Sequence, residues 1–155
     1  MELDATDRRI LAILQEDARI SNAELARRVK LTATPTLERV KRLEREGVIR
    51  RYAALVDPAA LGKGLTVFAS VQLAMHDAAG VDAFLEAVRA IPQVLECHHV
   101  TGEADFLVKV VVADTLEYEA FLRGALTQLP GVRQIRTSVV LSTPKNETAV
   151  PLEKA

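Results

Sequence analysis

The first 50 residues place polar and apolar side chains with the spacing of α-helices. Asp4 is suited to cap a helix whose apolar stripe consists of Ile10, Leu11, Ile13 and Leu14. Ser21 and Glu24 have the spacing of a capping box, in which the hydroxyl accepts from the amide three residues on and the carboxylate reaches back to the first amide. This second helix is expected to end near Lys30, and its buried side consists of Leu25, Ala26 and Val29.

A third helix is expected from about Thr34 to Glu46. Pro35 fits its first turn, where the missing N–H has no helical partner, and Gly47 ends it. Residues 48–56 then alternate like a strand until Asp57-Pro58 turns the chain. The inward side of the third helix is predicted to consist of Leu37, Val40 and Leu43.

The second half of the chain contains an internal near-repeat of a helix, a proline, one residue, a valine and a strand. Strand 65–75 leads to helix 79–91, strands 94–101 and 105–113 flank a tight turn, and a helix capped by Asp114 leads to strand 132–142. The order β-α-β-β-α-β is that of the ferredoxin-like fold, whose helices cover one face of the sheet. A second copy of the same sheet is the expected cover for the other face.

These patterns predict an α+β chain in two parts. A winged helix-turn-helix of three helices plus a strand would be joined to a ferredoxin-like βαββαβ sandwich. The predicted segments are residues 1–51 for the helical domain, 52–64 for a connecting strand and linker, 65–142 for the ferredoxin-like domain and 143–155 for a polar C-terminal tail.

The charge of the chain changes this picture only once it is divided along the sequence. The net charge is −1, with a hydrophobic share of 49% and a charged share of 26%, as in ordinary globular proteins. Residues 1–51 hold 12 Lys and Arg against 9 Asp and Glu, and residues 27–51 hold 9 against 3. This concentration of positive charge is what a phosphate-binding surface requires, although a solvated helix face would have the same composition.

The candidate chemistry of the second half is sparse. Cys97, His98 and His99 cannot converge on one ion if they lie on a strand, because neighbouring side chains point to opposite faces, so no metal site is predicted. Glu103 and Asp105 have no base or nucleophile beside them in sequence, so no enzyme activity and no cofactor are predicted. Without a signal peptide or a long apolar run, the chain is expected to be cytoplasmic, with no membrane partner.

Three short helices with a tight break before the third favour a helix-turn-helix, whose second helix enters the major groove. At about 100° per residue, Arg42 and Arg45 are predicted to project opposite the apolar stripe, with Arg39 and Lys41 beside it. Few aromatic side chains are available to stack on bases, so duplex DNA is favoured over single strands. A three-helix oligomerisation unit with a basic surface is the alternative. The predicted DNA-binding residues are Thr32, Thr34, Thr36, Arg39, Lys41, Arg42, Arg45, Arg50 and Arg51.

Several stretches then resemble the Lrp/AsnC family of transcriptional regulators over almost the whole chain. The similarity lies in residues 19–29 and 34–44, the Gly47-Val48-Ile49 sequence, residues 96–107 and Leu129-Pro130-Gly131-Val132. One departure is Lys30, where the family often has glycine, so that a residue with a Cβ must adopt the helix-ending conformation or the helix must end differently.

The resemblance implies that the second half senses a small amino acid, with leucine or another aliphatic amino acid expected as the effector. It also implies homodimers formed through the sheets, their assembly into a higher oligomer, often an octamer, and association with the nucleoid. One wall of the effector site would come from a Gly-x-x-Asp turn, and a neighbouring region or subunit would supply the other. The residues so implied are Thr101, Gly102, Glu103, Ala104, Asp105, Leu116, Ser138, Val139 and Val140.

Two alternative functions are compatible with the same residues. The chain could be an architectural DNA-binding protein without an effector, or the second half could be an amino-acid-sensing module that regulates an enzyme partner.

Overall fold

The computed structural model describes residues 2–74 and 77–152 and divides into two compact units. The first unit combines the N-terminal chain up to Leu55 with the C-terminal chain from Lys145 onwards. The second unit runs from Val56 to Pro144. The predicted end of the first strand at residue 75, the first residue and the last three residues of the tail lie outside the described ranges.

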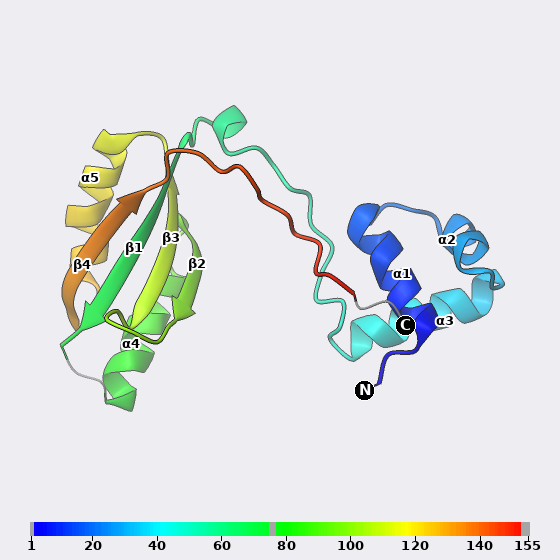
Figure 1. Ribbon diagram of the computed structural model, residues 1–155. Helices are drawn as coiled ribbons and strands as arrows, with labels where there is room; N and C mark the ends of the chain where they lie inside the picture. Colours follow the sequence, from blue (N-terminus) through cyan, green and yellow to red (C-terminus); the bar gives the residue numbers. More distant parts are fainter. Residues whose placement is uncertain (1, 75–76, 153–155) are drawn as a thin grey trace. The chain divides into compact units, whose positions relative to one another are not determined.

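The first unit is built from three helices, α1 (Ala5–Glu16), α2 (Asn22–Val29) and α3 (Ala33–Arg45) (Figure 1). Asp4 caps α1 as predicted, in a reciprocal capping box with Asp7. Ser21 accepts from the Glu24 amide at 3.2 Å, but the Glu24 carboxylate binds Arg27 instead of reaching back, so only half of the predicted box forms. The buried core of this unit consists of Ile10, Leu11, Ile13, Leu25, Val29 and Leu43.

The turn between α2 and α3 is closed by Lys30, which has φ +60° and ψ +42°. This is the left-handed conformation in which a side chain with a Cβ is strained. The next amide, from Leu31, donates to the Ala26 carbonyl at 3.0 Å, as in a helix-ending motif normally closed by glycine. The Asn22 side chain donates to the Ala33 carbonyl at 2.8 Å and ties the start of α2 to the start of α3.

Two parts of the first unit differ from the sequence-based expectation. Residues 48–56 form no strand, because they make no ladder of backbone hydrogen bonds with another segment of the described chain. Val150 and Leu152, which were predicted to lie in a separate polar tail, contact the helices of this unit. The Gln15 amide pairs with Val150 in both directions, donating to its carbonyl at 3.1 Å and accepting from its N–H at 2.7 Å. Leu152 packs against the core of the helices.

The second unit has the predicted β-α-β-β-α-β order. Its elements are β1 (Leu65–Leu73), α4 (Ala78–Arg89), β2 (Val94–His99), β3 (Phe106–Val112), α5 (Thr115–Gly124) and β4 (Val132–Val139), with short 3₁₀ turns at Ala59–Leu61 and Leu126–Gln128. The sheet has the strand order β2-β3-β1-β4, and each neighbouring pair is antiparallel (Figure 1). This confirms the ferredoxin-like topology.

The two faces of this sheet differ in whether helices cover them. Alternate residues of β1 and β3 are buried against α4 and α5, in a core that includes Phe84, Phe106 and Leu126. The intervening residues of β1, from Thr66 to Gln72, are half-buried and lie on the face that neither helix covers. The predicted strands ran one to three residues beyond the observed ends. The alternation of apolar and polar residues continues past the point where hydrogen bonding to the neighbouring strand stops.

Candidate nucleic-acid interface and effector site

The outward face of α3 is formed by side chains spaced three or four residues apart. Thr34, Glu38, Lys41 and Arg45 are all exposed, whereas Thr36 and Leu43 on the opposite side are fully buried. Three or four residues make one helical turn, so the four exposed side chains form a single line along the helix. We call these four residues the outer line of α3.

Two arginines of α3 are held inside the first unit instead. Arg39 donates to Asp7 at 2.8 Å and to Asp4 at 2.6 Å, and Arg42 donates to Asp7 at 2.6 Å. The Asp7 side chain is 1% exposed, while the Arg39 and Arg42 side chains are 29% and 38% exposed. The prediction that Arg42 projects away from the packed side of α3 is therefore wrong, because an aspartate of α1 draws it toward the core.

This cluster determines the charge that α3 presents. The backbone hydrogen bond from Asp7, followed by the Arg39 guanidinium, lowers the pKa of Asp4. The Asp4 and Asp7 carboxylates raise the pKa of Arg39. A buried carboxylate needs such partners, because an unpaired charge in a low-dielectric interior is strongly disfavoured. Arg39 and Arg42 thus fasten α3 to α1, and Lys41 and Arg45 remain as the basic side chains of the outer line.

The threonines around the start of α3 likewise include one buried residue and two exposed residues. Thr36 has no exposed surface, and its hydroxyl donates to the Thr32 carbonyl at 2.9 Å. Its predicted contact with DNA is thereby corrected, since a fully buried group within the helix has no surface to offer. Thr32 occupies the N-cap position with no capping hydrogen bond from its side chain, and both Thr32 and Thr34 are exposed.

Arg50 and Arg51 follow α3 in an extended segment and are both exposed. They line a wide hollow of about 1010 Å³ within the first unit, together with residues of α1 and of the C-terminal segment. Tyr52, also on this segment, donates to the Glu44 carboxylate of α3 at 2.9 Å, and desolvation followed by that carboxylate raises its pKa to about 12. The segment is thus attached to α3 without being part of a sheet.

The predicted effector turn connects β2 to β3 and is shaped by its own hydrogen bonds. Gly102 has φ +114°, a conformation that residues with a Cβ rarely adopt. Asp105 accepts from the Leu73 amide at 2.8 Å through its carboxylate, and its own amide donates to the Val71 carbonyl at 3.0 Å. Thr101 and Glu103 are exposed, and Ala104 is half-buried.

A hollow of about 350 Å³ lies beside this turn on the uncovered face of the sheet. Glu103 forms an ion pair with Arg136 of β4, and the Gln72 side chain donates to the Glu103 carbonyl. The lining residues are Ser70, Gln72, Val100, Thr101, Glu103, Ala104, Leu107, Gln134 and Arg136. The hollow therefore combines the turn with charged and polar side chains of β1 and β4.

The other predicted effector residues lie at the opposite end of the same sheet. Val140 donates to the Thr66 carbonyl near the start of β1, whereas Asp105 is bonded to Leu73 at its end. Seven residues of strand separate these positions by about 20 Å. Leu116, at the start of α5, is 75% exposed, and Ser138, Val139 and Val140 lie at or just beyond the end of β4. The two halves of the predicted site do not meet within one chain.

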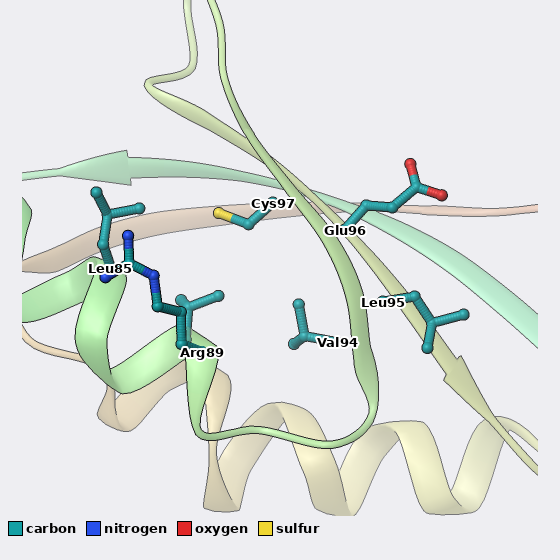
Figure 2. A pocket seen from close by; sticks show the side chains of 7 residues that line it. Leu85, Arg89, Val94, Leu95, Glu96 and Cys97 are labelled. Carbon is teal, nitrogen blue, oxygen red and sulfur yellow. The ribbon is translucent and has the colours of Figure 1, made fainter. Parts of the chain in front are cut away.

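A further hollow of about 350 Å³ separates α4 from the edge strand β2 (Figure 2). Leu85 and Arg89 line it from the helix, and Val94 and Cys97 line it from the strand. Burial raises the pKa of the Cys97 thiol. His99 stacks on Phe106 with ring centroids 4.8 Å apart, and His98 contacts Glu96, so the two histidines have separate partners. In residues 2–74 and 77–152, no cluster of three metal-ligating side chains and no helix suited to span a bilayer occurs.

Sequence reasoning missed three residues that matter for α3. The role of Asp7 was not predicted, because an aspartate in a first helical turn is normally a capping or solvated residue. Leu37 was expected inside but is 41% exposed, and Glu38 was given no role. The signal for Asp7 was an aspartate in the first helix together with two arginines, Arg39 and Arg42, about one helical turn apart in the third.

Both units match known protein families over most of their length. Residues 3–50 match the winged helix-turn-helix DNA-binding family, and residues 66–150 match the Lrp/AsnC ligand binding domain. The leucine-responsive regulatory protein of Escherichia coli K12 is 42% identical over 152 residues, which are 98% of this chain and 93% of that protein.

Solved structures show the same arrangement of elements. A transcriptional regulator from Neisseria meningitidis, in complex with L-methionine, has a TM-score of 0.91 at 37% identity and covers 97% of both chains. An AsnC family transcriptional regulator from Agrobacterium tumefaciens has a TM-score of 0.90 at 36% identity, covering 96% of this chain and 97% of the other.

Proposed function

Because this chain belongs to the Lrp/AsnC family of DNA-binding transcriptional regulators, we propose that it binds duplex DNA by placing the outer line of α3 in the major groove. The observation that carries this proposal is the separation of basic side chains on α3. Lys41 and Arg45 are exposed, while Arg39 and Arg42 are paired with buried Asp7. The recognition helix of such a motif contacts base edges with its N-terminal part.

The remaining candidate contacts are arranged around this line. Thr32 and Thr34 lie at the N-terminus of α3, where free amides and exposed hydroxyls suit phosphate oxygens. Arg50 and Arg51 add positive charge beyond its C-terminus. Arg39 and Arg42 are positioning residues in this proposal, since their guanidinium groups hold α3 against α1 through Asp7.

Salt dependence separates these two roles experimentally. Lys41→Ala and Arg45→Ala are expected to weaken binding to all duplex sequences and to reduce the slope of log K against log salt by about 1 each, if each contacts a phosphate. If Arg45 reads a base instead, its loss costs about 1–3 kcal/mol on the operator only. Fluorescence anisotropy of the purified chain on DNA from upstream of its own gene, at several salt concentrations, measures both quantities.

Arg42→Ala is the matched comparison. It is expected to leave the salt slope unchanged and to lower the thermal stability of the first unit, because Asp7 then loses one of its two arginines. A slope that falls for Arg42→Ala but not for Lys41→Ala and Arg45→Ala would contradict the proposed face.

For the second unit we propose an amino-acid effector site between subunits. The Neisseria relative binds L-methionine, and leucine, methionine or another aliphatic amino acid is the class proposed for this chain. Exposed amides of the turn at Thr101, Gly102 and Glu103 suit a carboxylate, and Ala104 and Asp105 complete that wall. Residues 138–140 lie at the opposite end of the same sheet, about 20 Å away, and Leu116 is exposed at the start of α5. A neighbouring subunit is therefore proposed to supply them.

We also propose that homodimers form through the uncovered face of the sheet and assemble further, up to an octamer. An effector that binds one assembly better than another shifts that equilibrium, and with it the affinity for DNA sites that need several dimers. The twofold dimer would prefer pseudo-palindromic sites, with adjacent half-sites about one helical turn apart. The proposed place of action is the nucleoid in the cytoplasm.

A further inference from the structure

Glu38 occupies the middle of the outer line of α3, one turn after Thr34 and one turn before Lys41. Its side chain is exposed, and no residue in the described ranges of the chain binds it. The other two acidic residues of this region are different, because Glu44 accepts from the Tyr52 hydroxyl and Glu46 lies 3.7 Å from Arg45. Glu38 is thus an unpaired carboxylate within the basic face proposed to meet DNA.

The arginines nearest to Glu38 along α3 do not offset its charge. Arg39 and Arg42 direct their guanidinium groups to Asp7, on the packed side of the helix. A carboxylate brought against duplex DNA meets the repulsion of the phosphates. An acidic side chain in this position therefore lowers affinity for DNA in general, unless a hydrogen-bond donor of the DNA binds it.

The major groove offers two amino groups as donors, N4 of cytosine and N6 of adenine. An ionised carboxylate accepts hydrogen bonds and donates none. Beside N6, adenine presents the N7 acceptor, whose lone pair repels a second carboxylate oxygen, whereas cytosine presents no acceptor there. A glutamate is thus matched to cytosine more closely than to adenine.

We propose that Glu38 is a specificity-determining residue that selects a cytosine in each half-site by accepting a hydrogen bond from its N4 amino group. This inference rests on the proposed placement of α3 in the major groove. It makes Glu38 a residue that lowers binding to wrong sequences, while Lys41 and Arg45 strengthen binding to all of them.

The test is selection of binding sites from a randomised duplex library by the full chain and by Glu38→Gln. The wild type is expected to select C at one position of each half-site. Replacing that cytosine by another base should weaken binding of the wild type roughly ten- to hundredfold. Glu38→Gln is expected to select A at that position, because an amide binds N6 and N7 of adenine together. Glu38→Ala is expected to lose selectivity there and to bind random DNA more tightly.

Glu44→Gln is the matched control, since it removes the same charge from the same helix and its amide oxygen still accepts from Tyr52. It is expected to keep the wild-type preference at every position. Selection of the same base at every position by the wild type, Glu38→Gln and Glu38→Ala would overturn the proposal, as would a change of preference in Glu44→Gln like that in Glu38→Gln.

Lys41→Ala and Arg45→Ala distinguish a failure of this inference from a failure of the proposed interface. Weaker binding by both variants, together with an unchanged base preference in Glu38→Gln, overturns the role of Glu38 alone. Unchanged binding by Lys41→Ala, Arg45→Ala and Glu38→Ala overturns the placement of α3 as well.

Discussion

Asp7 lies in the first turn of α1 and accepts hydrogen bonds from two arginines of α3. Composition alone counts Arg39 and Arg42 as equal to Lys41 and Arg45, because all four lie in the same basic stretch. The helical wheel drawn from apolar residues also pointed Arg42 outward. It failed because the packed side of α3 includes Thr36 and the two paired arginines, so polarity does not mark the exposed side there.

The carboxylate of Asp4 makes the stability of the first unit depend on pH in the acidic range. The pKa of Asp4 is lowered from its ordinary value of 3.8, so its contribution to stability is present above that value and is lost as pH falls through the lowered pKa. Asp4→Asn keeps a good helix-capping side chain but removes the charge that meets Arg39. The melting temperature of this variant is therefore expected to fall less than that of the wild type between about pH 6 and about pH 3.

Circular dichroism at both pH values measures this difference. Glu86→Gln, in the second unit, controls for removal of an exposed carboxylate that pairs with an arginine. Equal losses of melting temperature in the wild type and in Asp4→Asn would show that the Asp4 charge does not stabilise the folded state.

At the scale of elements, the prediction was most accurate where local chemistry fixes the ends. Helix α3 was expected over residues 34–46 and occupies Ala33–Arg45, and Asp114 caps α5 as expected, accepting from the Glu117 amide at 2.8 Å. The irregularity at Lys30 was also visible in the sequence, because a glycine was absent where the helix-ending turn needs positive φ.

The predictions that failed concern contacts distant in sequence. Residues 48–56 have the alternation of a strand, but a strand also needs a partner, which periodicity does not reveal. Residues 143–155 were predicted to form a polar tail, yet Leu152 packs on the core of the first unit and Val150 pairs with Gln15, which lies 135 residues earlier. The separation of the two halves of the effector site followed only from the strand register.

The C-terminal segment gives a prediction of its own. Gln15→Ala removes both hydrogen bonds to Val150, each worth about 0.5–1.5 kcal/mol, and should release the segment from α1. We expect the Val150 amide to exchange with solvent at the rate of an unprotected amide in this variant and to be protected in the wild type. Gln128→Ala, in the second unit, is the control. Equal protection in the wild type and in Gln15→Ala would contradict the docking of this segment.

In the whole molecule, the two proposed binding functions are assigned to different units. The chain passes from the first to the second after Leu55 and returns after Pro144. The proposed DNA-binding residues belong to the first unit, and the proposed effector residues belong to the second. The second unit holds the two halves of the proposed effector site at opposite ends of one sheet, so the proposed site needs a second copy of the chain to complete it.

We propose that amino-acid binding, assembly and DNA affinity change together. Light scattering follows the assembly state while L-leucine, L-methionine and other amino acids are titrated, and anisotropy follows binding to DNA from upstream of the gene in the same samples. We expect at least one aliphatic amino acid to shift the mass of the assembly and the DNA affinity over the same concentration range. No change in mass and no change in affinity with any of the amino acids would contradict this coupling.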